Sequence, residues 1–311
     1  MKLSKFSQNS LAIMKTRFET CLLIFLIIPF GLLSQKNENP IEDIANNDKS
    51  YILTDVSYIS DAVFMGRRDS IRAPYTLPSI AYYDKSGFFA DISVSYLTAS
   101  AEQRVDLFLL SAGYLFESKK WSGGISATGY FFSEESYNVQ SELTANISGL
   151  ISYDLKAIEI SLTASNFFNS ASSSDIFGEL LLDRTFYTKD RKFLIKPGVA
   201  LSAGTQNFYE TYYQENRLGN RKDSGQGSQD QNTPTEIKIR EATAFNILNF
   251  ELSMPLHYYY KSFIFSFKPV VAFPQSSATI TTEDTVIAED LRTVFYWSAG
   301  LSYWFVTKKD Q

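Results

Sequence analysis

Few side chains in this sequence could do chemistry, and the best-placed of them are two lysines and an acid. Lys196, Glu251 and Lys268 fall on the polar phase of three consecutive segments of alternating hydrophobicity, and each lysine precedes a proline. If these segments are neighbouring strands, the three residues predict a Lys–Glu–Lys ladder that neutralises charge across them. Such a ladder is either a structural network that fills a narrow interior or a constriction for an ion or a substrate.

Further acids share the polar phase of other segments. They are Asp55, Asp91, Glu142, Glu159, Glu179 and Asp183, and the single histidine, His257, is on the same phase of its segment. Carboxylates that line a pore attract cations, and low-dielectric walls focus their field. A conducting interior of this composition is expected to prefer cations weakly.

The sequence indicates no catalytic, cofactor or metal site. One histidine and one cysteine leave little scope for zinc or iron, and there is no Gly-rich phosphate loop and no G-x-S-x-G elbow. His257 stands in Leu256-His257-Tyr258-Tyr259-Tyr260 beside a short turn, a setting typical of a membrane interface. We therefore expect a protein that is not an enzyme.

The N-terminus has the features of a secretory signal peptide. Lys15 and Arg17 precede an apolar stretch of 13 residues, Cys21–Leu33, which is too short for a bilayer-spanning helix. Met14 is an alternative start. Removal of residues 1–35 takes away four basic residues and one acid, so the formal net charge changes from −5 to −8. An acidic chain argues against nucleic-acid binding.

Alternation of apolar and polar residues predicts strands with one apolar face. In Phe88–Leu97, for example, Phe88, Ile92 and Tyr96 oppose Asp91 and Ser93. The same reading predicts twelve strands, at 51–66, 75–83, 88–98, 104–117, 121–133, 138–153, 157–168, 174–188, 192–204, 242–259, 262–274 and 291–306. Ten or fourteen strands are alternative counts.

The connections between these segments alternate in length. Tight turns are expected at Asp84–Gly87, Ser118–Lys120, Asp154–Lys156, Lys189–Arg191 and Tyr260–Lys261, with longer connections between them, the longest being Thr205–Glu241 and Gln275–Asp290. Short periplasmic turns that alternate with longer extracellular loops are typical of a membrane barrel. The predicted fold is an all-β, transmembrane, antiparallel meander barrel.

This fold implies a domain plan and a location. Residues 36–50 are expected to form a short periplasmic segment, 51–306 the barrel, 205–241 a long, polar extracellular loop that cannot bury itself, and 307–311 a periplasmic tail. Aromatic residues make up 15% of the chain, which suits the interface girdles of a barrel in the outer membrane of a Gram-negative bacterium. Its partners would be outer-membrane lipid and, during biogenesis, the assembly machinery, which recognises an aromatic-ended last strand such as Val294–Val306.

Two functions remain open from the residues alone. The Ser- and Thr-rich polar phase favours a narrow passive channel for small solutes. The large polar insert favours a non-catalytic scaffold or accessory subunit of an outer-membrane complex, because twelve strands enclose a lumen that side chains can fill.

One local motif resembles a known family. Ser60-Asp61-Ala62-Val63-Phe64-Met65-Gly66-Arg67, followed by the segment 78–89 (PSIAYYDKSGFF), is similar to the start of the TorF-type porins, which begin with an S-D-x-x-F-x-G element and an S-G-F-type hairpin. The motif covers roughly a tenth of the chain, and Met65 stands where that family usually has arginine. The resemblance implies an outer-membrane barrel and a passive channel.

Overall fold

The computed structural model describes residues 49–68, 72–99, 103–133, 136, 138–141, 143–169, 173–212, 238–239, 242–281, 286–289 and 291–307. The predicted signal peptide, most of the segment 36–50, the tail after Thr307, the middle of the long loop and Glu142 lie outside the described residues.

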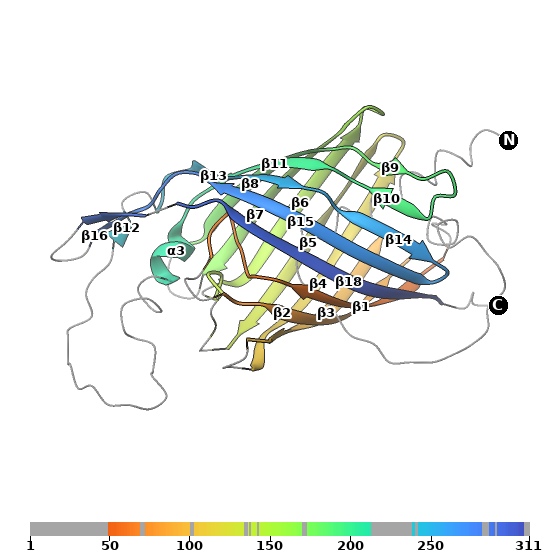
Figure 1. Cartoon of the computed structure of the whole chain (residues 1–311), viewed down its shortest axis with the longest axis horizontal. Helices are drawn as coiled ribbons and strands as arrows, with labels where there is room; N and C mark the ends of the chain where they lie inside the picture. Colours follow the sequence, from red (N-terminus) through yellow and green to blue (C-terminus); the bar gives the residue numbers. More distant parts are fainter. Residues whose placement is uncertain are drawn as a thin grey trace.

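Twelve strands form a closed antiparallel barrel (Figure 1). In chain order they are β1 (Tyr51–Ile59), β2 (Tyr75–Tyr83), β3 (Phe88–Leu97), β4 (Arg104–Ser118), β5 (Trp121–Phe132), β6 (Leu143–Asp154), β7 (Glu159–Asn169), β8 (Asp175–Asp183), β11 (Gly198–Gly204), β13 (Asn246–Ser253), β15 (Phe263–Pro274) and β18 (Val294–Val306). Each strand pairs with the next, and β18 pairs with β1 to close the ring. The predicted meander of twelve strands is confirmed.

Three of the predicted strands are each split in two. The short strands β9 (Phe186–Tyr187), β10 (Phe193–Ile195) and β14 (Leu256–Tyr260) continue β8, β11 and β13 beyond interruptions at 184–185, 196–197 and 254–255. Two of these interruptions contain a proline, Pro197 and Pro255, which has no N–H to donate to a sheet ladder. The sequence predicted continuous strands here because hydrophobic alternation passes through these positions.

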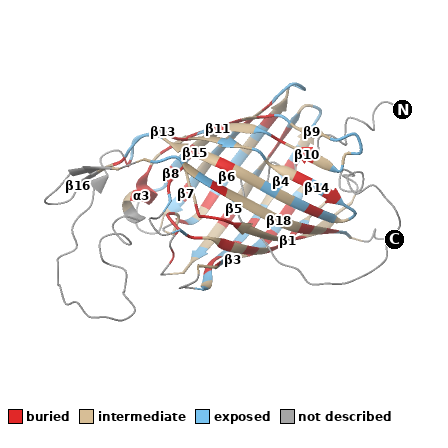
Figure 2. Ribbon diagram, in the orientation of Figure 1, coloured by how far each residue is buried: buried red, intermediate tan, exposed pale blue. Residues whose placement is uncertain are grey.

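The two faces of the wall differ as the alternation predicts. Large apolar side chains such as Ile80, Phe88 and Ile125 are exposed on the outside, while polar side chains such as Ser111 and Ser152 are buried inside. Buried and exposed residues accordingly alternate along the strands (Figure 2). Leu143 is an exception. Alternation predicts that it faces outward, but the register shifts near the start of β6 and its side chain is buried in the core. An apolar outer face and a polar lumen are the pattern of a barrel that spans a membrane.

The two ends of the barrel are unlike. We call the end with the five short connections, at 84–87, 119–120, 155–158, 188–192 and 261–262, the turn end, and the opposite end the loop end. Tyr51 pairs with Val306, so the barrel begins and ends at the turn end. Lys119, Lys156, Arg191 and Lys261 have positive φ in four of the turns, and Gly87 has it in the fifth.

The loop end carries additional structure (Figure 1). A short helix, α3 (Asn207–Tyr212), follows β11, and a small sheet joins β12 (Lys238–Ile239), β16 (Thr279–Thr281) and β17 (Val286–Ala288). The two longest predicted loops are therefore in contact. The expectation that 205–241 cannot bury itself is wrong at its start, since Gln206 and Phe208 are fully buried.

No helix in the described part of the chain is long and apolar enough to cross a membrane.

Candidate functional site in the barrel lumen

The first predicted strand, 51–66, ends early at Ile59, and the chain then folds as a hairpin. Phe64 and Arg67 exchange two backbone hydrogen bonds of 2.8 and 2.9 Å. The two residues between them, Met65 and Gly66, have φ of 49° and 76°, which makes a two-residue turn with both central residues left-handed. Alternation continues through this segment in the sequence, but the backbone reverses where glycine permits it.

This hairpin, residues 60–67, reaches across the lumen. The Phe64 ring lies 5.8 Å from that of Phe167 on β7, 5.5 Å from Phe177 on β8 and 5.1 Å from Phe208 on α3. In the ring of twelve strands β7 lies opposite β1, from which the hairpin emerges. We call the hairpin and residues 206–209 the plug. Phe208 and Tyr209 belong to a buried apolar cluster inside the barrel, and the partly buried Phe64 packs against it.

A buried carboxylate places the helical part of the plug. Asp175, with no exposed surface, accepts hydrogen bonds from the backbone N–H groups of Asn207 and Phe208 at 2.8 and 2.7 Å. The Thr205 hydroxyl donates to the same carboxylate at 2.6 Å. An acid that accepts from the first N–H groups of a helix stabilises that start, so Asp175 holds Phe208 against Phe64.

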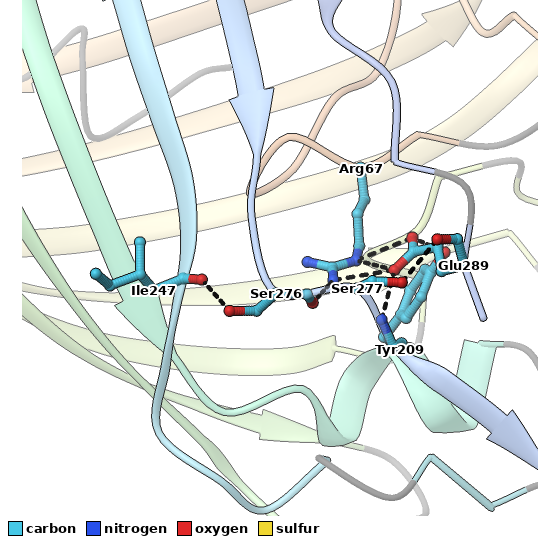
Figure 3. Close-up of polar contacts among 7 residues, drawn as sticks. Arg67, Tyr209, Ile247, Ser276, Ser277 and Glu289 are labelled. Carbon is cyan, nitrogen blue, oxygen red and sulfur yellow. Dashed lines mark hydrogen bonds and ion pairs between the residues drawn. The ribbon is translucent and has the colours of Figure 1, made fainter.

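A buried ion pair ties the hairpin to the last long loop (Figure 3). The Arg67 guanidinium lies 3.1 Å from Glu289, donates to the Ser276 carbonyl at 3.0 Å and stacks over the Tyr209 ring at 4.9 Å. Glu289 also accepts from the Tyr209 hydroxyl at 2.7 Å and from the Ala278 N–H at 3.1 Å. We call Arg67, Tyr209 and Glu289 the latch, because they join the hairpin, α3 and the loop before β18.

Beneath the plug the lumen contains a cavity of about 190 Å³. One side of it, the charged wall, carries Glu179, Ser202, Glu251, Lys268 and Tyr296, from β8, β11, β13, β15 and β18. The other side, the hydroxyl wall, carries Ser126, Thr128, Ser148, Thr163 and Ser165, from β5, β6 and β7. Val63, Phe64 and Met65 of the hairpin line the same cavity. Both walls therefore carry polar side chains, apolar residues such as Leu109, Phe167 and Leu181 also line the cavity, and the hairpin borders it.

The two carboxylates of the charged wall are held by neutral donors. Glu179 accepts from the Ser202 hydroxyl at 3.2 Å. Glu251 accepts from the Asn249 amide at 2.8 Å and from the Tyr296 hydroxyl at 3.3 Å. Within the described part of the chain neither carboxylate forms an ion pair, although Glu179 interacts electrostatically with Glu251 and with Lys268.

The predicted Lys196–Glu251–Lys268 ladder needs correction. Glu251 stands opposite Ala200 on β11 and Ala272 on β15, so each lysine lies four residues nearer the turn end than Glu251's cross-strand neighbour. Four residues of strand are roughly 13 Å, which is too far for a ladder across one row. Lys196 pairs instead with Asp183 at 3.2 Å, both buried, while Glu251 and Lys268 line the cavity.

The other predicted lumen residues occupy different levels of the barrel. Asp55 accepts from Ser302, and Asp91 is buried on β3. Glu159 is buried where it faces Asp183 across β7 and β8, near the turn end. His257 is buried on β14, with its ring 6.4 Å from that of Tyr259. These residues do not line the cavity.

Sequence reasoning missed the latch. Arg67 was visible only as the residue that follows the S-D-x-x-F-x-G motif, and Glu289 stood in a predicted extracellular loop with no periodicity to give it a partner. Among the described residues no three His, Cys, Asp or Glu side chains gather as metal ligands.

No family model matches this sequence, and no curated protein matches it. Among solved structures the chain is similar to the KdgM porin and to the NanC porin, each at 10% identity and a TM-score of 0.45. Each match covers 81% of this chain and 98% of the porin chain. It is also similar to LpxR from Salmonella typhimurium, at 9% identity and a TM-score of 0.40, with 82% and 100% covered. These values assign neither a family nor a substrate, so function has to be inferred from the lumen of this chain.

Proposed function

We propose that this protein is a narrow, porin-like channel of the outer membrane that passes small solutes and is closed at its loop end by the plug. The observation that carries this proposal is the polar cavity beneath the plug. A scaffold needs no such space, because inward side chains can fill a barrel of this size. Here hydroxyl and charged side chains border a cavity of about 190 Å³, which supports passage of polar solutes when the plug moves.

The proposed location rests on the wall of the barrel and on the sequence. A closed barrel with apolar side chains outside satisfies all its backbone hydrogen bonds within the membrane. The predicted signal peptide supports export. We place the turn end, where β1 begins and β18 ends, in the periplasm and the loop end outside the cell.

The resemblance to the TorF-type porins gains a structural context. Its S-D-x-x-F-x-G element, with the arginine that follows, is the hairpin of the plug, so the matched residues have a role in closing the lumen. We propose membership of that family on this ground, with the channel function it implies. The proposal involves no catalysis.

Electrical recording in a planar bilayer tests the channel. Purified protein, shown to be folded by its different mobility on a gel with and without boiling, should give brief, small openings. A salt gradient should show weak preference for cations, since Glu179 and Glu251 outnumber Lys268 around the cavity. A silent bilayer, both for this protein and for the variants with a broken latch described below, would instead favour the scaffold.

A further inference from the structure

The cavity has more than enough room for water alone. One water needs only about 10–15 Å³ of such space, whereas this cavity offers about 190 Å³. Polar groups on two walls and apolar side chains such as Leu109 and Phe167 line this space, so it suits a small solute that combines polar groups with an apolar frame.

The charges around the cavity do not balance. Glu179 and Glu251 face one lysine, Lys268, which leaves one formal negative charge in excess. Uncompensated charge in a low-dielectric interior is unfavourable, and either a bound proton or a cationic solute relieves it. An anionic solute would be repelled by the same carboxylates.

The carboxylates also have hydrogen-bonding capacity to spare. Asn249 and Tyr296 both donate to one oxygen of Glu251, Oε1, and the Ser202 hydroxyl donates to Oε2 of Glu179. No donor among the described residues occupies the second oxygen of either group. A carboxylate oxygen can accept from an ammonium group or from a hydroxyl group, and the bond to the ammonium is the stronger.

The hydroxyl wall complements this arrangement. In the ring of strands, β5, which carries Ser126 and Thr128, lies opposite β15, which carries Lys268. Hydroxyl groups both donate and accept, so they pair with the hydroxyl groups of a solute in many orientations. A solute that spans the cavity would meet acids on one side and hydroxyls on the other.

We propose that the cavity binds one small amine that carries several hydroxyl groups, such as a monosaccharide-sized amino sugar, between the charged wall and the hydroxyl wall. This proposal deepens the proposed channel function by naming its solute class, but binding can be measured without conduction. The Glu179 and Glu251 carboxylates accept from the ammonium group, and the hydroxyl wall holds the rest of the solute.

Four probes of matched ring size separate the contributions of charge and hydroxyl groups. Titration calorimetry on the purified, folded barrel would use D-glucosamine, D-glucose, D-glucuronate and cyclohexylamine near pH 6, where the amines are protonated. Glucosamine should bind most tightly, with glucose about tenfold weaker because the charge-assisted bond is lost. Cyclohexylamine should also be weaker, and glucuronate should give no heat of binding.

Variants then assign the site. Glu251→Gln and Glu179→Gln should each reduce the roughly tenfold preference for glucosamine over glucose by about threefold, because the two carboxylates share the ammonium group. The control is Asp55→Asn, which removes an inward carboxylate that does not line the cavity and should leave the preference unchanged. All measurements are repeated with Arg67→Gln, so that a closed plug cannot hide the site.

The outcomes are distinguishable. If glucosamine binds neither the unmodified protein nor Arg67→Gln, or if glucuronate binds as well as glucosamine, the proposal is overturned. If glucosamine binds more tightly than the other three probes but the bilayer stays silent, the binding site is supported and the channel is contradicted. Conduction without preferential binding of glucosamine would support the channel and contradict the binding site.

Discussion

Arg67 and Glu289 are separated by 222 residues in the chain, yet they form a buried ion pair of 3.1 Å at the loop end of the barrel. The pair connects the hairpin that follows the first strand to the loop that precedes the last one. Since β1 and β18 are neighbours in the ring, the latch fixes the hairpin close to the seam where the barrel closes. The three side chains of the latch therefore hold the plug at the loop end of the lumen.

Breaking the latch should open the channel. Arg67→Gln leaves Glu289 with the Tyr209 hydroxyl and the Ala278 N–H, whereas Glu289→Gln leaves a buried guanidinium without its carboxylate. We expect more frequent openings from both variants, and a larger loss of stability, about 3–5 kcal/mol, from Glu289→Gln. Bilayer recording and the temperature at which the folded band disappears from a gel measure the two effects.

The matched control for the latch is Arg68→Gln. Arg68 follows the hairpin and pairs with Asp61, but its side chain is 42% exposed, and the buried Asp61 keeps the hydrogen bond from the Ala73 N–H. This change should therefore alter opening little and stability less than Arg67→Gln does. Equal behaviour of Arg67→Gln and Arg68→Gln would show that the latch does not hold the plug.

The aromatic contacts of the hairpin should be needed for closure as well. Phe64→Ala removes a partly buried ring that packs on Phe167, Phe177 and Phe208, so the loss should fall below the roughly 3–5 kcal/mol typical of a fully buried phenylalanine. Liposomes that contain this variant should swell faster in small sugars. Phe295→Ala, at a residue 57% exposed on the outer face, should leave swelling unchanged; faster swelling with both variants would mean general damage to the barrel.

The hairpin turn should not accept a side chain at Gly66. A Cβ there would lie 2.6 Å from Asn249 Oδ1 and 2.9 Å from Pro274 Cβ, and φ is +76°. We expect Gly66→Ala to displace the hairpin, lower the unfolding temperature and raise permeability. Gly149→Ala is the control, since a Cβ at Gly149 meets nothing within 4 Å. An unaltered Gly66→Ala protein would exclude this packing of the hairpin.

A carboxylate in the first turn should make one end of the barrel sensitive to acid. Hydrogen bonds from the Ser86 hydroxyl and amide, then from the Ser50 and Tyr82 hydroxyls, hold the pKa of Asp84 well below its ordinary value. A depressed pKa stabilises the fold above the unfolded pKa, about 4, and this contribution is lost as the pH falls through the lower folded pKa.

Hydrogen exchange tests this expectation. Protection of the Ser86 amide, which donates to Asp84 at 2.9 Å, should stay constant from pH 7 to about 4 and fall at more acid pH. Asp84→Asn should lower the protection of the Ser86 amide over this whole pH range. The same substitution should not change the protection of the Lys156 amide, which lies in another turn. If Ser86 is equally protected in both proteins, the turn does not depend on this charge.

The orientation in the membrane can be read with two tags. An epitope inserted at position 224, within the predicted loop 205–241, should be accessible to antibody on intact cells. The same epitope between Lys119 and Lys120, at the turn end, should be labelled only after permeabilisation. The opposite pattern would place the turn end outside the cell.

Much of the wall follows from the sequence, because each of its residues has only two possible directions. A side chain in a strand points either to lipid or to the lumen, so alternation along Phe88–Leu97 or Val294–Val306 identifies the apolar face without knowledge of neighbouring strands. The lengths of the connections, in turn, order the strands as a meander. Strand number, strand order and the polar lumen could be predicted for this reason.

The candidate site could not be predicted in the same way, since it depends on register and on chain reversal. Cross-strand pairing places Glu251 opposite Ala200 and Ala272. No local sequence pattern reveals this alignment, because it arises from the stagger between strands that closes the barrel. The reversal at Met65-Gly66 likewise occurs within an alternating segment. By itself, then, the sequence determined a twelve-stranded barrel with an apolar outside and a polar inside. Only the tertiary structure decided that Lys196 pairs with Asp183, that Phe64 crosses the lumen and that Arg67 meets Glu289, because these contacts join residues that closure of the barrel brings together.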